Sequence, residues 1–249
     1  MKEEKELGGG LGLAGNRGKA AQQEGPRLGA RFTSKNMYGS GFFSLKLKIV
    51  KTDNGIVMAI YLISGIKSDT DPGNHDELDF EFLGGWNPYI LQTNVFLDDV
   101  GGREQRIPLW FFVDGIPVRL IKRSGGLRYP SKPMYVKGSV WQGNWALPKG
   151  TTTDWRKAPF KVQYQLFDIA GCTVPANGNI NSCQAKSKRN WWNQDGFGQL
   201  TPRQQLLYNN VTKHLCYNYC VDPQRYNGRV PPECRGQFNP TIAKLWCWN

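Results

Sequence analysis

Apolar and acidic side chains alternate in the segment His75–Leu83, and this is the clearest structural pattern in the chain. Successive side chains of an extended strand point to opposite faces. The three carboxylates of Glu77, Asp79 and Glu81 therefore share one face, and the apolar side chains between them, such as that of Phe80, are expected to face a core. Like charges this close destabilise a strand. The pattern therefore indicates a row of acids with a functional role.

Other short segments alternate in the same way, and glycine or proline residues separate them. Near the C-terminus the apolar spacing becomes helical and predicts a helix from Thr201 to about Cys220, with Thr201 as its cap and Pro202 in its first turn. Many short strands favour an all-β sandwich over alternating strand–helix units. The predicted strands are Phe42–Val50, Val57–Ser64, Asp76–Leu83, Tyr89–Phe96 and Phe160–Phe167.

The length of 249 residues is sufficient for one sizeable domain with a hydrophobic core. Residues 1–26 are charged and glycine-rich, lack the apolar run of a secretion signal, and are expected to be disordered. Residues 27–171 carry the predicted sandwich, and residues 172–249 form a C-terminal extension. The chain has 9 Trp, 10 Tyr and 12 Phe, an abundance that suits stacking on sugar rings, although core packing is the commoner role of any single ring.

Lys and Arg number 32 against 20 Asp and Glu, which gives a net charge of +12. A charge of this size is compatible with nucleic acid, an anionic membrane or an acidic polysaccharide as partner. The basic residues are scattered, with neither a basic helix nor an RNA-binding signature, so nucleic acid is not expected. No apolar stretch is long enough to span a membrane. Retention among acidic polysaccharides remains as a hypothesis.

Six cysteines all follow residue 171, and this clustering predicts a local disulfide framework in an oxidising compartment. A zinc site is the competing interpretation, because Cys216 and Cys220 have loosely ligand-like spacing. Asn210 begins an Asn-Val-Thr sequon, which is usable for glycosylation only in a secreted chain.

Glu77 and Glu81 have a spacing that suits cleavage of a glycosidic bond. Their backbones lie roughly 13 Å apart on a strand that rises about 3.4 Å per residue. Side chains that lean together approach the roughly 5–5.5 Å separation of retaining glycosidases, whereas inverting enzymes need about 6.5–9.5 Å. One Glu then serves as nucleophile and the other as acid/base, and Asp79 hydrogen-bonds the nucleophile and separates the two pKa values. The alternative is a solvated acidic edge strand.

Polar residues that follow the carboxylate strand suit a sugar-binding cleft. Gln92 and Asn94 lie two positions apart and share a strand face, but ordinary solvent-facing residues have the same spacing. Arg103 and Glu104 have a competing interpretation as a surface ion pair worth at most about 1 kcal/mol. His75 is expected to position the start of the strand rather than to act as a base.

Together, these segments resemble the plant xyloglucan endotransglucosylase/hydrolases of glycoside hydrolase family 16. The resemblance is carried first by His75–Gly84 (HDELDFEFLG) and extends over roughly residues 29–238. The number and order of the motifs make it specific. The other motifs, in the family's order, are Tyr38–Phe43, Gln92–Asn94, Gly102–Glu104, Phe112–Arg119, Tyr129–Met134, Asp154–Trp155, Ala158–Phe160, Tyr217–Cys220 and Pro232–Cys234.

The resemblance assigns a role to each member of the carboxylate row. It implies Glu77 as nucleophile, Asp79 as its helper and Glu81 as acid/base, with no cofactor and no metal. It also makes Trp141 and Trp145 better candidates for sugar stacking than most rings. The implied substrate-binding residues are Gln92, Thr93, Asn94, Gly102, Arg103, Glu104, Asn144, Trp145, Gly150 and Arg225.

The fold implied by the resemblance is a concanavalin-like β-jelly-roll sandwich with a short, helix-containing, disulfide-bonded C-terminal extension. The implied disulfides join Cys172 to Cys183 and Cys220 to Cys234. Cys216 and Cys247 are left as a third bridge or as free thiols.

The implied activity is cleavage of the β-1,4-glucan backbone of xyloglucan with retention, followed by transfer to another xyloglucan chain. A xyloglucan-specific endo-hydrolase is the alternative. The implied partners are xyloglucan donor and acceptor, with neither nucleic acid nor membrane. The implied setting is a secreted monomer in the cell wall.

The chain departs from the family pattern at two places. The secretion signal and first strands that precede residue 27 in the family are missing, and so is a segment between Trp110 and Phe111. Asn144 also stands where the family usually has Asp. Lost strands would expose sheet edges. A catalytically impaired sugar-binding scaffold is therefore the alternative from a different functional class.

Overall fold

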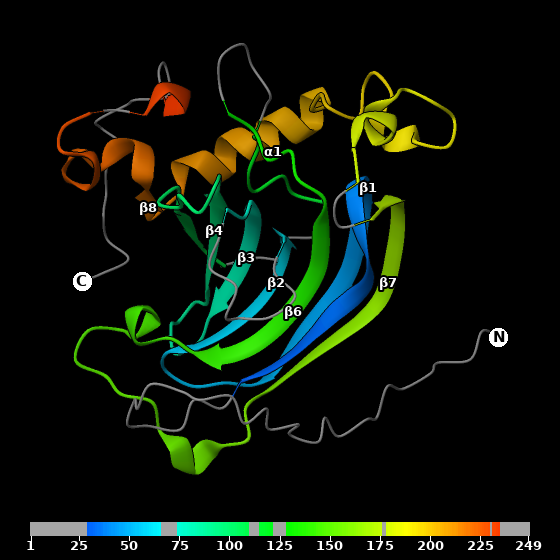
Figure 1. Ribbon diagram of the computed structural model, residues 1–249. Coiled ribbons are helices and arrows are strands. Elements are labelled where there is room, and N and C mark those ends of the chain that lie inside the picture. The colour runs from blue at the N-terminus through cyan, green and yellow to red at the C-terminus, as the bar shows by residue number, and fades with distance from the viewer. Residues whose placement is uncertain are drawn as a thin grey trace.

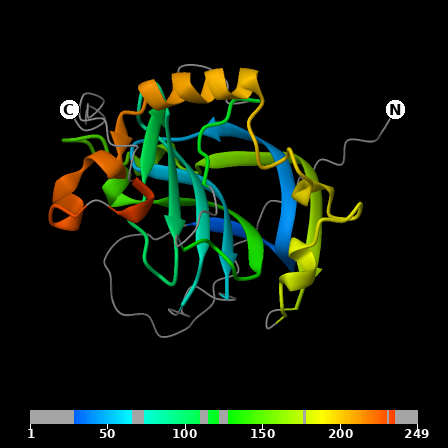
Figure 2. The ribbon, with the colours of Figure 1, turned by 90° about the horizontal axis from the view of Figure 1, so that it is seen from above.

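The computed structural model describes residues 29–65, 74–109, 115–121, 128–175, 178–229 and 231–234. Its strands form one eight-stranded antiparallel sheet in the order β7-β1-β6-β2-β3-β4-β5-β8. The sheet is strongly curved, and the helix α1 lies across one end of the strands (Figures 1 and 2). The strands are β1 Ala30–Lys51, β2 Ile56–Ser64, β3 Glu77–Leu83, β4 Ile90–Phe96, β5 Gln105–Pro108, β6 Met134–Gln142, β7 Lys161–Val174 and β8 Tyr217–Asn218.

All five predicted strands are present, and those assigned to β2, β3 and β4 begin within one residue of their predicted start. The strand predicted at Phe42–Val50 is much longer, because the first part of β1 pairs with β6 and the second part pairs with β7. The strand predicted at Phe160–Phe167 likewise continues to Val174. The sequence patterns did not predict β5, β6 or β8.

The helix α1, Pro202–Lys213, begins where the sequence predicts it. The Thr201 hydroxyl accepts a hydrogen bond from the Gln204 backbone, and the Gln204 side chain accepts one from the Thr201 backbone, which satisfies two otherwise unpaired N–H groups. The helix ends well before Cys220, contrary to prediction. The chain must leave the helix because Tyr217–Asn218 joins the sheet beside β5.

The predicted fold class is confirmed: an all-β jelly-roll architecture with a helix-containing, disulfide-bonded C-terminal extension. Short 3-10 helices punctuate the loops and the extension. They are η1 Asn144–Ala146, η2 Trp155–Lys157, η3 Asn181–Gln184, η4 Trp191–Asn193, η5 Tyr219–Val221, η6 Pro223–Tyr226 and η7 Pro232–Cys234.

The main hydrophobic cluster lies on the same face of the sheet as the carboxylate row. Val57, Leu83 and Ile90 are aligned on neighbouring strands, and Leu83 follows Glu81 by two positions, so its side chain shares that face. The extension packs against this end of the row. The η1 segment adds Ala146 to the hydrophobic cluster. The extension adds Cys216, Tyr217, Tyr219, Cys220 and Cys234.

The opposite face of the sheet is covered unevenly. Met58 and Leu91 are fully buried there, but Phe80 is 40% exposed. The expectation that the apolar residues of the carboxylate strand all enter a core is therefore wrong for Phe80. In register, Phe80 is flanked by Ile60 and Thr93, which border the ring at its sides and leave it open to solvent.

Both predicted disulfides are present, Cys172–Cys183 and Cys220–Cys234. Cys216 is disulfide-bonded as well, which excludes the free-thiol alternative for this residue. The expectations for residues 1–26 and for the Trp110–Phe111 junction lie outside the described residues. The division at residue 171 stays a prediction.

Candidate active site

Strand β3 presents Glu77, Asp79 and Glu81 on one face, and neighbouring strands extend this face to both sides. In the antiparallel register, Asp79 lies between Tyr61 of β2 and Asn94 of β4. Pairing without a register shift keeps aligned side chains on the same face. The acids are therefore surrounded by polar and aromatic groups, in contrast to the solvated edge strand of the alternative interpretation.

Glu81 is held by a short chain of polar side chains. The Gln92 amide donates to Glu81 Oε2 at 2.6 Å, and Arg106 Nε donates to Gln92 Oε1 at 2.5 Å. Burial raises the pKa of Glu81 to about 7, with the Gln92 hydrogen bond and the Arg106 charge acting in the opposite direction and the Glu77 charge adding to the rise. At neutral pH the Glu81 carboxyl is thus poised to donate or accept a proton.

Glu77 and Asp79 form a coupled pair at the start of the strand. Burial and the charges of Glu77 and Glu81 raise the pKa of Asp79 well above its usual value, and a hydrogen bond joins the Asp79 and Glu77 carboxyls. Burial also raises the pKa of Glu77, but the hydrogen bond from Asp79 and the proximity of His75 hold it down. His75 Nε2 lies 3.2 Å from Glu77 Oε2.

Three predicted polar residues of β4 divide between the two faces of the sheet. Gln92 and Asn94 share the carboxylate face, and Asn94 Oδ1 accepts hydrogen bonds from the backbone of Val95 and Arg103. Thr93 points to the opposite face, beside Phe80, and its hydroxyl accepts a hydrogen bond from Arg119 at 2.9 Å. Thr93 is therefore set apart from the other predicted substrate-binding residues.

Arg103 and Glu104 form separate ion pairs, so the interpretation as a mutual surface ion pair is wrong. Arg103 Nε contacts Glu233 at 2.7 Å, and Glu104 contacts Arg225 at 2.6 Å. Both partners lie in the C-terminal extension because the extension folds over the loop before β5. The Tyr226 hydroxyl donates to the carbonyl of Gly102 in the same loop.

Aromatic rings lie near the Arg106 end of the row. Trp141 and Trp145 have ring centroids 6.1 Å apart, and the Arg106 guanidinium lies 5.9 Å from the Trp145 ring. Trp145 is 39% exposed and is available to a flat ligand. Asn144 accepts a hydrogen bond from Gln142 at 2.5 Å.

Gly150 has a φ of +73°, which glycine adopts readily in a turn, and nothing lies within 4 Å of an added Cβ; its contact with substrate stays a prediction.

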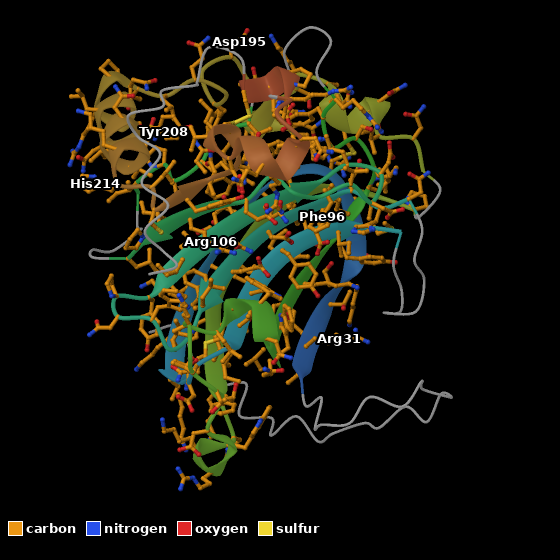
Figure 3. All side chains as sticks on the ribbon, turned by 90° about the vertical axis from the view of Figure 1, so that its left-hand side faces the viewer. Arg31, Phe96, Arg106, Asp195, Tyr208 and His214 are labelled. Atoms are coloured by element: carbon orange, nitrogen blue, oxygen red, sulfur yellow. A yellow bond between two sulfur atoms is a disulfide. The ribbon has the colours of Figure 1, made fainter. Side chains whose placement is uncertain are left out.

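Arg106 is the main residue of the site that the sequence patterns did not single out. Burial lowers its pKa to about 10, while the Glu104 charge acts in the opposite direction. It lies over the sheet, whereas Asp195 lies at the edge of the molecule (Figure 3). A signal was present: Arg106 follows Glu104 by two positions and so projects to the same face of an extended chain.

The chain matches the family profile of glycosyl hydrolases family 16 over residues 13–157, and residues 186–234 match the profile of the xyloglucan endo-transglycosylase C-terminus. The protein is therefore a member of glycoside hydrolase family 16.

The chain is also similar to curated plant proteins. It is 42% identical over 236 residues to xyloglucan endotransglucosylase/hydrolase protein 2 of Arabidopsis thaliana, covering 83% of this chain and 78% of that protein. It is 40% identical over 235 residues to a probable xyloglucan endotransglucosylase/hydrolase protein of Nicotiana tabacum, covering 83% and 77%. Within family 16, the chain belongs to the xyloglucan endotransglucosylase/hydrolases.

Among solved structures, a Bacillus licheniformis β-glucanase is 22% identical, with a TM-score of 0.40 over 55% of this chain and 69% of that chain. In the part of the chain that the structure describes, no helix has the length and apolar character needed to cross a membrane. Across the same residues, no group of three or more His, Cys, Asp or Glu side chains is arranged to hold a metal ion.

Proposed function

We propose that the protein cleaves the β-1,4-glucan backbone of xyloglucan with retention and transfers the glycosyl group to another xyloglucan chain. The observation that carries the proposal is the row Glu77, Asp79 and Glu81, whose outer carboxyls lie in different environments. Burial raises the pKa of Glu77, but hydrogen bonds from Asp79 and His75 favour its ionised form, while the pKa of Glu81 is raised to about 7. This difference suits a nucleophile and a proton donor.

In the first step a Glu77 carboxylate oxygen attacks the anomeric carbon as the glycosidic carbon–oxygen bond breaks. Glu81 gives its proton to the departing oxygen, and a covalent glycosyl-enzyme remains. In the second step the acceptor 4-hydroxyl transfers its proton to Glu81 and bonds to the anomeric carbon, which releases Glu77 as a carboxylate. Water in place of the acceptor gives hydrolysis.

Asp79 assists by orienting Glu77. Its carboxyl remains protonated because burial and two neighbouring carboxylates disfavour its ionised form. A protonated carboxyl donates one hydrogen bond and fixes the rotamer of the nucleophile. It also adds no third charge to the row.

The substrate is held by the polar and aromatic groups beside the row. Gln92 and Asn94 offer amide groups on the carboxylate face, and Trp145 offers an exposed ring for stacking on a pyranose. The Arg103–Glu233 and Glu104–Arg225 pairs fix the extension next to this surface. A bound acceptor chain there would exclude water and favour transfer.

The test is incubation of purified protein with xyloglucan and a labelled xyloglucan oligosaccharide acceptor. Label that enters polymer supports the proposal. A fall in viscosity without incorporation of label indicates an endo-hydrolase. If neither change is seen, the result favours a sugar-binding scaffold without activity. Glu77→Gln is expected to abolish either activity.

The matched control for Glu77→Gln is Asp195→Asn, since Asp195 is exposed and pairs only with Lys186 among the described residues. It should retain full activity. Activity of Glu77→Gln at the level of the control would contradict the assignment of the nucleophile.

The proposal extends to the setting of the enzyme, a secreted monomer of the plant cell wall that acts on neither nucleic acid nor membrane. Asn210 is exposed on α1, so its sequon is accessible for glycosylation. The net charge of +12 would retain the protein among acidic wall polysaccharides. High salt should then elute it from wall preparations, and retention that is insensitive to salt would contradict this part of the proposal.

A further inference from the structure

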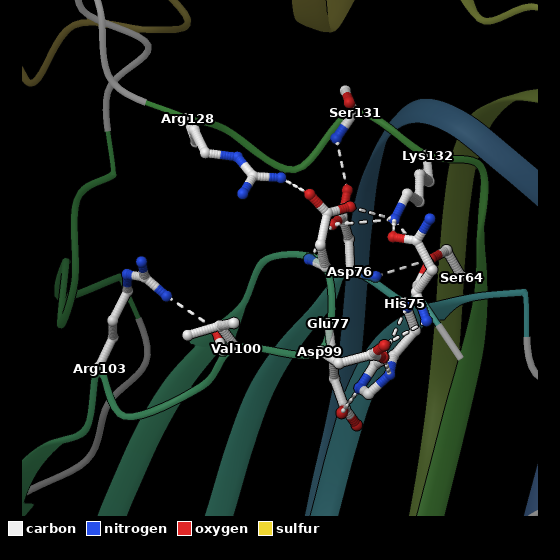
Figure 4. Close-up of polar contacts among 12 residues, drawn as sticks. Ser64, His75, Asp76, Glu77, Asp99, Val100, Arg103, Arg128, Ser131 and Lys132 are labelled. Atoms are coloured by element: carbon white, nitrogen blue, oxygen red, sulfur yellow. Dashed lines mark hydrogen bonds and ion pairs between the residues drawn. The ribbon is translucent and has the colours of Figure 1, made fainter. Parts of the chain in front are cut away.

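His75 lies between two carboxylates at the start of β3 (Figure 4). Its Nε2 is 3.2 Å from Glu77 Oε2, and its Nδ1 is in close contact with Asp99 Oδ1. The imidazole also stacks on Phe96, with ring centroids 5.5 Å apart and an interplanar angle of 29°. With 16% of the side chain exposed, the ring is held on three sides.

Asp99 is itself fixed in place by the backbone before β3. Its carboxylate accepts hydrogen bonds from the backbone N–H groups of Asn74 and, at 2.8 Å, of His75. These contacts lower the pKa of Asp99 and keep it ionised. Asp98 and Asp99 have φ values of +47° and +66°, a conformation that non-glycine residues adopt when the surrounding structure demands it.

A polar cluster around Asp76, which is 3% exposed, holds Asp98 and Asp99 in this backbone conformation. Asp76 accepts backbone hydrogen bonds from Asp98 at 3.1 Å and Ser131 at 2.9 Å, and its own N–H donates to Ser64 Oγ at 2.8 Å. Lys132 joins the cluster by contacting Asp98 at 2.5 Å. Three segments that are distant in sequence therefore meet at the start of the carboxylate strand and hold the turn that carries Asp99.

We propose that His75 and Asp99 act as a positioning pair that orients the carboxylate of Glu77 for attack. The inference rests on the proposed function, because it assigns a task within that reaction. Asp79 contacts Glu77 from one side, and His75 contacts it from the other. A carboxylate held from two sides keeps one rotamer, and a displacement of about 1 Å at a reacting group lowers the rate by roughly a hundredfold.

His75 also stabilises the form of Glu77 that the reaction uses. Both the charge and the hydrogen bond of His75 act to lower the pKa of Glu77 against the effect of burial. Asp79, on the same strand, and Lys137, on β6, also lower the pKa of this carboxyl, and the Glu77 charge interacts in turn with Glu81 and with Tyr61 of β2. Loss of His75 would remove two of the four largest effects that oppose burial and leave those of Asp79 and Lys137.

Two substitutions separate positioning of Glu77 from simple support of the turn. His75→Gln keeps a donor near the position of Nε2, which contacts Glu77, whereas His75→Asn keeps one near Nδ1, which contacts Asp99. If His75 positions the nucleophile, kcat should fall by roughly ten- to hundredfold in His75→Asn with little change in KM, and His75→Gln should recover much of the loss. A role confined to the turn predicts the reverse order, which would overturn the proposal.

The matched control is His214→Asn, because His214 is the other histidine of the chain and lies at the exposed C-terminal end of α1. It should leave kcat unchanged. Asp99→Asn provides a second variant in case a His75 variant melts early. It should lower kcat in the same direction while Glu77 and His75 remain in place.

A second readout does not require turnover. The carboxyl of Glu77, labelled with carbon-13 and identified by its loss in Glu77→Gln, can be followed by NMR as the pH changes. Its midpoint should rise in His75→Asn and rise less in His75→Gln. If the wild type is inactive but this order holds, the proposed function fails and the pairing stands. If the midpoints coincide with that of the wild type, the pairing fails.

Discussion

Replacing Glu81 with Gln should stabilise the folded protein at alkaline pH, by an amount that follows from the structure. Burial raises the pKa of Glu81 from 4.5 to about 7. Between these two values the unfolded chain loses the Glu81 proton while the folded protein keeps it. The contribution of Glu81 to the unfolding free energy is therefore fully present below about pH 4.5. It is lost as the pH rises through about 7, because the folded state must then ionise the Glu81 carboxyl.

The size of the effect follows from the separation of the two pKa values. Each unit corresponds to about 1.4 kcal/mol, so ionising Glu81 destabilises the folded state by about 3 kcal/mol above pH 8. A glutamine does not ionise and keeps an oxygen that accepts the Gln92 hydrogen bond. Removing the Glu81 charge also relieves Asp79, whose pKa that charge helps to raise, and this second effect has the same sign.

The measurement is urea denaturation of the wild type and Glu81→Gln at pH 4 and pH 8, with the disulfides intact. The decisive quantity is the change in unfolding free energy between the two pH values, because contributions that do not depend on pH cancel. From pH 4 to pH 8, the unfolding free energy should fall by about 3 kcal/mol less in the variant than in the wild type. Asp195→Asn, which alters an exposed carboxylate, should follow the wild type. Equal pH dependence in the wild type and Glu81→Gln would refute the reasoning.

Three further predictions test the site and its frame. Gln92→Leu removes the 2.6 Å hydrogen bond to Glu81, which should raise the pKa of Glu81 and move the alkaline limb of a transfer-activity profile up by about one pH unit; an unmoved limb would contradict this. The double substitution Cys220→Ala and Cys234→Ala removes a disulfide between residues 14 positions apart. It should lower the unfolding free energy by about 3 kcal/mol in urea titrations. Trp145→Ala removes an exposed ring and should raise the acceptor KM roughly tenfold with a smaller change in kcat, so an effect confined to kcat would argue against stacking.

The carboxylate strand could be predicted from the sequence because its information is local. Alternation with a period of two fixes which residues share a face, and β3 begins within one residue of the predicted start. The cap of α1 was similarly predictable, because Thr201 and Gln204 lie three positions apart. The end of the helix was not, since it depends on β8 pairing with a strand more than a hundred positions earlier.

Strand β6 shows how packing hides a strand from sequence patterns. It contains Gly138, where an added Cβ would lie 2.2 Å from the Phe32 ring, so the glycine makes room for an aromatic side chain of β1. It also buries Lys137, which is 3% exposed. Glycine and lysine are both depleted in strands. Only the neighbouring strands explain their presence here.

The ion pairs that hold the extension were equally invisible in the sequence. Arg103 and Glu233 are 130 positions apart, and Glu104 and Arg225 are 121 apart. The adjacency of Arg103 and Glu104 instead favoured a mutual pair, although neighbouring residues of an extended chain point in opposite directions. Each residue therefore finds a partner on a different part of the extension.

Both ends of β3 are anchored, and this explains how the strand tolerates three partly buried acids. At one end, Leu83 lies in the hydrophobic cluster that the C-terminal extension completes, and at the other end Asp76 lies in the polar cluster that holds the turn of Asp99. Between them the strand carries Asp79 and Glu81, whose raised pKa values report an unfavourable ionised state. A strand with free ends would relieve this by rotating its carboxyls into water. Anchoring at both ends prevents that movement, so stability supplied by Leu83 and Asp76 maintains the proton affinities that the proposed reaction needs.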